Sequence, residues 1–258
     1  MTTPPSDVPS GSVSVVVHAS PRRPLRELPL DRLTSRERWR LDRYRQVADK
    51  ERFATARTLA REALGALQGI DPARVRIDVD PPGPTHGRVS TPDGPAFSIA
   101  HAGGIVLVAV LTGGPTGARV GVDIDHPDAV RGHLDELSDA VPPAERPAAG
   151  WSVETFTRAW VRREAALKAV GCGLLAPRDD LVLGPADAAP AVMRSAGLPG
   201  SAGAILLRDL TAAEVGALVD THERAFATVA VVVPGSGPSH DQLDAAHITV
   251  RTLRTPVD

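Results

Sequence analysis

The chain is 258 residues long, with 42% apolar and only 3% aromatic residues and a formal net charge of −2. This length allows one large or two small domains with a substantial core. Cys172 is the only cysteine, which excludes an intrachain disulfide, and no apolar run approaches the roughly 20 residues that span a bilayer. The first residues lack the basic and apolar blocks of a signal peptide. We therefore expect a soluble, cytoplasmic protein.

The first part of the chain is expected to combine a helical region with several strands. β-Branched residues favour the first strand and period-two alternation favours the second. The Gly103-Gly104 pair between two apolar runs is typical of a hairpin. In chain order, the expected elements are a disordered lead (1–11), a strand (Ser12–His18), a helical region (Thr34–Leu67), a strand (Ala73–Asp80) and a hairpin (Ala96–Ala102 and Ile105–Leu111).

The second part of the chain is expected to contain a similar mixture. Its most regular helical pattern covers Thr155–Val170 and ends at Gly171 and Gly173, because glycine favours helix termination. The stretches 12–117 and 118–233 are two halves of similar order, without visible sequence identity. The other expected elements are a strand (Arg119–Asp125), a weak helix (Asp128–Ala140), three strands (Ala204–Leu210, Gly216–Asp220 and Phe226–Val233) and a loose C-terminal tail (234–258).

Positive charge is concentrated in the first helical region. Between Arg22 and Glu62, twelve arginines and one lysine stand against seven acidic residues, a local excess of six charges. Such an excess attracts phosphate groups, although a solvated arginine-rich helix face explains it equally well. The scarcity of aromatic side chains weighs against a nucleic-acid module that stacks bases.

Two carboxylates end the predicted strand Arg119–Asp125. Asp123 and Asp125 are two residues apart, so on a strand they project from the same face. Carboxylates that converge in this way are half of a site for a hard cation such as Mg²⁺, which completes its shell with water and substrate phosphate. Two solvated carboxylates at a strand end are the alternative.

The helix Thr155–Val170 carries three charged residues of interest. Glu164 and Lys168 lie four residues apart beside its apolar arc, the spacing of a simple stabilising ion pair. Arg163 falls inside the arc, so it is expected to meet an anion or a carboxylate. Lys168 is one of two lysines in a chain rich in arginine, and unlike arginine it can release a proton. This pattern favours a proton donor at Lys168.

Taken together, these segments resemble a known family. The segments GVDID (121–125) and FTRAWVRREAALKAVGCGL (156–174) are similar to the paired signature of the Sfp-type 4′-phosphopantetheinyl transferases, and Glu164 follows Asp123 by 41 positions. The resemblance covers about residues 13–233. Further similar segments, in the family's order, are Ala48–Arg61, Gly87-Arg88, Phe97–His101 (FSIAH) and 208–233.

The resemblance implies an α+β fold of two similar α/β halves, packed as an intramolecular pseudo-dimer with the active site between them. It implies Mg²⁺-dependent transfer of the 4′-phosphopantetheine moiety of coenzyme A to a serine of an acyl, polyketide or peptidyl carrier protein. The second product is 3′,5′-ADP. We expect a monomer that binds coenzyme A and a carrier protein, and neither nucleic acid nor a membrane.

By the same resemblance, Asp123, Asp125 and Glu164 are the Mg²⁺ ligands, Glu164 is also the plausible base, and Lys168 is the acid. The expected contacts to coenzyme A are Arg36 or Arg40, together with Arg57, Arg88, His101 and Arg163. The chain departs from the family pattern where Asp125 replaces Glu, Arg88 and Arg163 replace Lys, and Ala100 replaces Ser.

Three other functions fit the same residues. The first is a different Mg²⁺-dependent phosphate or nucleotide transferase that uses the same carboxylates. The second is a non-catalytic module that binds anions or nucleic acid through its arginine-rich helices, and this binding would survive EDTA. The third is a degenerate relative that binds coenzyme A without transfer. Labelled coenzyme A and an apo-carrier would separate them.

Overall fold

The computed structural model describes residues 12–81, 87–92, 94–173, 176–198, 203–218, 224–235 and 248–254. Its strands are β1 (Val13–Pro21), β2 (Asp78–Val79), β3 (Val89–Ser90), β4 (Phe97–Ala102), β5 (Ile105–Gly113), β6 (Arg119–Asp125), β7 (Val182–Leu183), β8 (Val192–Arg194), β9 (Gly203–Asp209), β10 (Phe226–Pro234) and β11 (Ile248–Arg254). One sheet has the order β11-β1-β5-β4, and a second has the order β6-β10-β9. The strands β2 and β3 form a small ribbon, as do β7 and β8.

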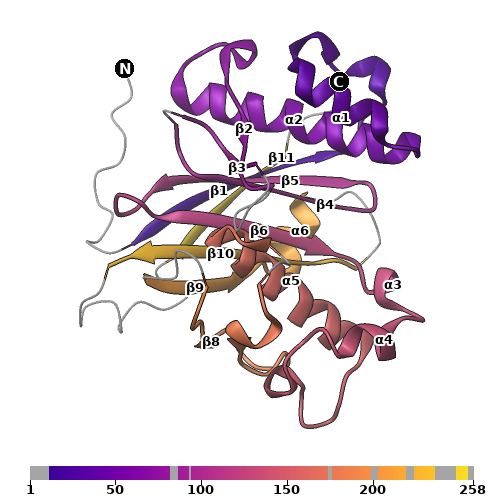
Figure 1. The fold of residues 1–258 in the computed structure, drawn as a ribbon, viewed down its shortest axis with the longest axis vertical. Helices are drawn as coiled ribbons and strands as arrows, with labels where there is room; N and C mark the ends of the chain where they lie inside the picture. The colour runs from indigo at the N-terminus through magenta and orange to yellow at the C-terminus, as the bar shows by residue number, and fades with distance from the viewer. Residues whose placement is uncertain are drawn as a thin grey trace.

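The helices lie mainly on the outer faces of these sheets. They are α1 (Ser35–Arg43), α2 (Val47–Gln68), α3 (Pro127–Val130), α4 (Leu134–Ser138), α5 (Val153–Val170) and α6 (Ala212–Leu218), with short 3-10 turns at Leu25–Glu27, Leu30–Arg32, Pro72–Arg74, Pro143–Glu145 and Arg178–Asp180. Figure 1 shows α1 and α2 above the sheets and α5 below them. The protein is therefore a mixed α+β fold.

Alternating side chains explain how the two main sheets are layered. On β5, Ile105, Leu107 and Ala109 belong to a core shared by both sheets, whereas Val106 and Val108 belong to the core under α2. A strand buried on both faces reads as a continuous apolar run, as β5 does. The order of layers is thus α2, first sheet, shared core, second sheet and α5 (Figure 1).

The first sheet meets the second where β4 lies against β6. Ser98 on β4 accepts a 3.1 Å hydrogen bond at its Oγ from the backbone N–H of Val122 on β6. On the other face of β6, Gly121 lets α5 approach closely, because a Cβ there would lie 2.0 Å from the carbonyl oxygen of Ala165. These two contacts place the end of β6 between β4 and α5.

Some predicted elements have different bounds in the structure. The helical region Thr34–Leu67 is two helices, because the chain is extended at Tyr44 and Gln46, which flank the end of α1 and the start of α2. The predicted helix Asp128–Ala140 is split into α3 and α4, with Gly132 in a left-handed conformation between them. Only Asp78–Val79 of the predicted strand Ala73–Asp80 is extended and paired.

The prediction of a strand at Gly216–Asp220 is wrong for the described residues, which form the helix α6. Thr211 and Glu214 start this helix with reciprocal hydrogen bonds of 3.2 and 2.8 Å between side chains and backbone N–H groups. This capping box outweighs the β-branched residues nearby.

The prediction of a loose tail over 234–258 is also wrong for residues 248–254. They form β11, which pairs in parallel with β1, and Ile248 is 3% exposed in the shared core. Burial of an apolar face on an otherwise unpaired edge of the sheet explains why this segment is ordered. The predicted disordered lead 1–11 lies outside the described residues.

No helix in the described parts of the chain is long and apolar enough to cross a bilayer.

Candidate functional site

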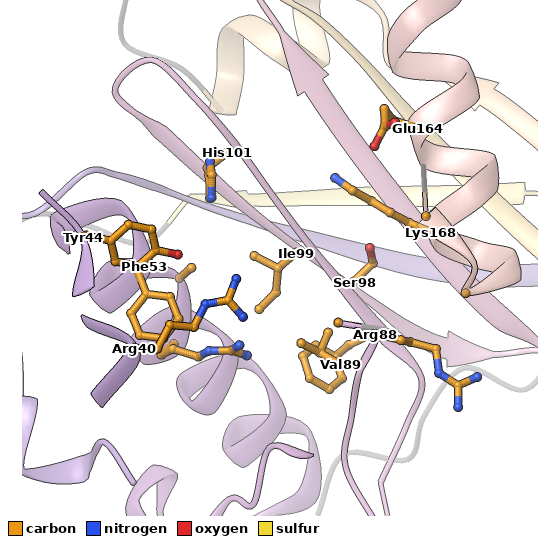
Figure 2. Close-up of a pocket in the computed structure, with 16 residues that line it drawn as sticks. Arg40, Tyr44, Phe53, Arg88, Val89, Ser98, Ile99, His101, Glu164 and Lys168 are labelled. Atoms are coloured by element: carbon orange, nitrogen blue, oxygen red, sulfur yellow. The ribbon is translucent and has the colours of Figure 1, made fainter. Parts of the chain in front are cut away.

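A cavity of about 270 Å³ lies between the first helices and the C-terminal half of α5. Figure 2 shows Glu164 and Lys168 at one end, Arg40, Tyr44 and Phe53 at the other, and His101 between them. Residues of α1 and α2 thus form one wall of the cavity, and residues of α5 form another. Of the eight predicted site residues besides Glu164 and Lys168, four line this cavity: Arg40, Arg57, Arg88 and His101.

Helix α5 presents Glu164 and Lys168 to the cavity. Ser152 and Thr155 begin the helix with a capping box, and Gly171 ends it with a left-handed φ of 94°. The Nζ of Lys168 donates to Oδ1 of Asp123 at 2.6 Å and to the carbonyl oxygen of Val122 at 3.3 Å. Lys168 therefore pairs with the strand β6 rather than forming the local ion pair with Glu164 that was the alternative interpretation.

Glu164 is half-buried, and one of its carboxyl oxygens is fully buried. Its Oε1 has no hydrogen-bond partner among the described residues. Burial raises the pKa of Glu164, and the negative charge of Asp123 raises it further, against the opposing effect of Lys168. An unpartnered buried oxygen next to a second carboxylate is an expensive arrangement that a cation relieves.

Of the two aspartates of β6, Asp123 contacts this helix through Lys168. Asp123 is 8% exposed, and burial raises its pKa despite the ammonium of Lys168. Burial also raises the pKa of Asp125, whose Oδ1 accepts a 2.8 Å hydrogen bond from the backbone N–H of His126. One oxygen of Asp125, the third expected ligand, is therefore already hydrogen-bonded to the backbone of His126.

The donor set fits a magnesium ion in chemical type, although the oxygens are not assembled around one point. No group of three or more His, Cys, Asp or Glu side chains in the described ranges is close enough to hold a metal ion. Glu164 offers an unpartnered oxygen, whereas Asp123 shares one oxygen with Lys168. Oδ1 of Asp123 can bind a cation only if Lys168 releases it. We conclude that Asp123 and Glu164 are the primary candidate ligands.

The opposite end of the cavity is positively charged. The guanidinium carbons of Arg40 and Arg57 lie 5.7 and 5.2 Å from the centre of the Phe53 ring. A second cavity of about 600 Å³ continues beyond this wall and is lined by Arg36 and Trp39 as well as by Arg40 and Arg57. The structure thus places Arg40 in the main cavity and Arg36 only in the outer one.

His101 and Arg88 occupy the middle of the site. Partial burial and the positive charge of Lys168 lower the pKa of His101. Arg88 forms a 3.0 Å ion pair with Asp80, packs against Gly171, and points its guanidinium away from Lys168 in Figure 2. Ala100 packs in the shared core, so this departure from the family pattern removes a hydroxyl from a position that faces the core.

Arg163 does not belong to the cavity, which corrects the expectation that it contacts coenzyme A. Its Nη1 donates to Oε1 of Glu145 at 3.0 Å and to the carbonyl oxygen of Leu181 at 2.8 Å, and its Nη2 donates to the carbonyl oxygen of Arg178. Both Arg163 and Glu145 are buried. The carboxylate alternative for Arg163 is therefore confirmed, and its role is to fix α5.

Tyr44, Phe53 and Ser98 are among the residues that line the cavity but were not predicted as site residues. The two aromatic residues carried a usable signal, since aromatics are rare in this chain and these two flank the arginine-rich helices. Ser98 lies one residue after Phe97 in the recognised FSIAH segment. Its contact with Val122 depends on how the sheets meet, and no local pattern contains that information.

Comparison with models of known protein families gives no match to this chain, and comparison with curated proteins gives none either.

Proposed function

We propose that this protein transfers the 4′-phosphopantetheine group of coenzyme A to a serine of a carrier protein in a Mg²⁺-dependent reaction. One observation supports the proposal above all: Glu164, which has an unpartnered oxygen, and Lys168, which is paired with Asp123, line one end of a cavity whose other end holds Arg40 and Arg57. Carboxylates for a cation and cations for phosphates at opposite ends of one cavity match a substrate with a diphosphate and further phosphate charge.

Each residue of the site has a separate role in the proposed reaction. Arg40, Arg57 and His101 bind and orient the phosphate groups. Asp123 and Glu164 would hold the Mg²⁺ ion, which when bound neutralises the diphosphate. Glu164 accepts the proton of the carrier serine as its oxygen attacks the β-phosphorus. The bond between this phosphorus and the oxygen that bridges it to the α-phosphate breaks, and Lys168 donates a proton to the departing 3′,5′-ADP.

The release of Lys168 from Asp123 is part of this proposal. In the described geometry the ammonium group neutralises Asp123. If Asp123 and Glu164 held a divalent cation, the ammonium group of Lys168 would be free to donate to the leaving phosphate. One lysine then stabilises the buried carboxylate before substrate binds and acts as the acid afterwards.

The proposal also concerns the internal symmetry of the fold, the oligomeric state and the cellular compartment. Each half supplies a long helix that packs on antiparallel strands, α2 on β5 and α5 on β6 and β10, and the two sheets share a core. We propose that these halves are a pseudo-dimer, and that the protein acts as a monomer in the cytoplasm.

Release of 3′,5′-ADP tests the proposed reaction. Wild-type protein with coenzyme A, Mg²⁺ and an apo-carrier should release one 3′,5′-ADP per carrier, and Glu164→Gln should nearly abolish release while the fold is kept. The matched control is Glu154→Gln, which changes a partly exposed glutamate in the first turn of the same helix. Undiminished release by Glu164→Gln at low Mg²⁺ would remove Glu164 from the site. Coenzyme A binding without release would favour the degenerate relative.

A further inference from the structure

Ser98 is a buried residue of the main cavity to which the proposed reaction gives no role. It is 4% exposed and lies on β4, an edge strand of the first sheet. Its Oγ accepts the 3.1 Å hydrogen bond from the backbone N–H of Val122. Val122 lies on β6, an edge strand of the second sheet. The hydroxyl group therefore joins the two sheets beside the cavity.

Both backbone polar groups of Val122 face this junction. Along an antiparallel strand, the N–H and C=O groups of one residue point to the same side of the strand. The N–H of Val122 donates to Ser98, and its carbonyl oxygen accepts a 3.3 Å hydrogen bond from Nζ of Lys168. Side chains thus satisfy the two groups where the sheet has no further strand.

Val122 connects Ser98 to a candidate metal ligand. Asp123 follows Val122 directly, and its Oδ1 accepts the 2.6 Å hydrogen bond from the same Nζ of Lys168. Figure 2 shows Ser98 on the same side of the cavity as Lys168 and Glu164. Asp123 is therefore held at two points, by Lys168 at its carboxylate and by Ser98 at the preceding residue.

The proposed reaction removes the first of these two contacts. Lys168 donates to Asp123 in the described geometry, and to the leaving phosphate during transfer. The hydrogen bond between Val122 and Ser98 involves no group that changes its partner in the reaction. A buried N–H group without an acceptor is costly, so the edge of β6 would shift if the hydroxyl group were absent.

We propose that Ser98 is a positioning residue, whose hydroxyl group fixes the backbone of Val122 and thereby keeps Asp123 in place to bind the cation. This inference rests on the proposed function for the identity of the cation and of the reaction. A merely structural role, in which Ser98 only joins the two sheets, predicts a loss of stability and no change in cation binding by the folded protein.

Cation binding measures this role without catalysis. Mn²⁺ is the probe, because carboxylate ligands suit it as they suit Mg²⁺. In isothermal titrations with coenzyme A present, Ser98→Ala should lower the Mn²⁺ affinity by about 2- to 10-fold, the factor that corresponds to one typical hydrogen bond. Ser98→Thr keeps the hydroxyl group and should restore most of the affinity.

Ser98→Cys is a second variant in case one of these proteins does not fold. Its side chain is close in size to serine, but sulfur is a weak hydrogen-bond acceptor. It should therefore lower the Mn²⁺ affinity in the same direction as Ser98→Ala.

Ser20→Ala is the matched control, since it also removes a buried serine hydroxyl group from the first sheet. Ser20 is 3% exposed on β1, and its Oγ donates to the carbonyl oxygen of the adjacent Pro21 at 2.9 Å. It lines neither the main nor the outer cavity. The variant should lose stability in denaturant unfolding and keep the wild-type Mn²⁺ affinity.

Transfer kinetics provide the second readout. Ser98→Ala should raise the Mg²⁺ concentration that gives half-maximal turnover, with little change in KM for coenzyme A. Reduced stability with unchanged Mn²⁺ affinity and unchanged Mg²⁺ dependence would overturn the inference. So would an equal loss of Mn²⁺ affinity in Ser20→Ala, or a folded Ser98→Thr protein that binds Mn²⁺ as weakly as Ser98→Ala.

The two readouts distinguish failure of the inference from failure of the function. Weaker Mn²⁺ binding by Ser98→Ala, with a wild-type protein that modifies no carrier, would support the positioning role and contradict the transfer reaction. Carrier modification with a Mg²⁺ dependence that Ser98→Ala leaves unchanged would keep the proposed function and overturn the role of Ser98. A wild-type protein that binds no Mn²⁺ would contradict both.

Discussion

At the scale of a single residue, two roles of Lys168 have to be separated: neutralisation of Asp123 and donation of a proton. Its ammonium group neutralises the buried Asp123 at 2.6 Å, and its position beside Glu164 in the cavity suits a proton donor. A structural ion pair needs only the charge, whereas an acid needs a removable proton, which arginine does not supply. Substitution therefore separates the two duties.

Lys168→Arg should lower turnover by about 10²–10⁴, the usual contribution of a positioned acid or base, and change coenzyme A affinity much less. Lys168→Ala should weaken both binding and turnover, because it also removes the charge. Steady-state kinetics and coenzyme A titrations of both variants give the result. Near-normal turnover in Lys168→Arg would end the claim that Lys168 is the acid.

Arg163 illustrates a charged residue whose role is in the scaffold. Arg163→Met leaves Glu145 buried without its cation, so we expect the free energy of unfolding to fall by about 3–5 kcal/mol. The folded variant should keep its affinity for coenzyme A, because the guanidinium points away from the cavity toward Glu145 and Leu181. Denaturant unfolding and coenzyme A titration at low temperature check both expectations. A large loss of affinity with unchanged stability would return Arg163 to the site.

The raised pKa of Glu145 predicts how the free energy of unfolding depends on pH. Burial raises its pKa to about 7, from 4.5 for an exposed glutamate. Between these values the folded protein holds a proton that the unfolded chain has released. The stability due to this group is therefore fully present below about pH 4.5 and is lost as the pH rises through about 7.

Glu145→Gln cannot titrate, so its stability relative to the wild type should rise as the pH is raised from 5 to 8. Denaturant unfolding of both proteins at each pH gives the difference. A difference that is constant over this range would show that the carboxyl group is ionised throughout.

At the scale of elements, the contact of α5 with β6 determines where the proposed catalytic residues Glu164 and Lys168 lie. Gly121 has no space for a side chain, because an added Cβ would lie 2.0 Å from the carbonyl oxygen of Ala165 and 2.5 Å from the backbone nitrogen of Ala169. Both obstacles are backbone atoms of α5, so the helix must move as a body. Such a shift would carry Glu164 and Lys168 away from Asp123.

Gly121→Ala should therefore cost about 1–3 kcal/mol of stability or more, and should reduce transfer even in molecules that remain folded. Gly104→Ala is the matched control, since nothing lies within 4 Å of its added Cβ. Thermal unfolding and transfer rates of both variants test this. Normal transfer in a folded Gly121→Ala protein would contradict the claim that this contact positions the catalytic residues.

An element could be predicted from the sequence when the residues that cause it are close together in the chain. The helix predicted at Thr155–Val170 is Val153–Val170 in the structure, because its apolar arc and glycine end are local signals. The hairpin at Gly103-Gly104 is likewise confirmed. By contrast, β11 exists because β1 offers it an edge, and this pairing joins segments more than 200 residues apart. No window of sequence contains that information.

At the scale of the whole molecule, one cavity gathers residues from both halves of the chain. The sequence predicted which residue types belong there, and it placed Arg57, Arg88 and His101 in the same site as Glu164 and Lys168. It did not distinguish Arg36 from Arg40, because that choice depends on how α1 turns against α2. Nor did it reveal that Asp123 pairs with Lys168, since that contact requires the fold.

The central claim is the transfer itself, and intact-mass analysis of carrier proteins tests it most directly. Apo-carriers of the fatty-acid, polyketide and nonribosomal-peptide types are incubated with the protein, coenzyme A and Mg²⁺, with a parallel reaction in EDTA. We predict that at least one carrier gains the mass of one phosphopantetheine group, and that EDTA or a carrier without the acceptor serine abolishes the gain. Unchanged masses for all three carrier types, with folded protein that binds coenzyme A, would contradict the account.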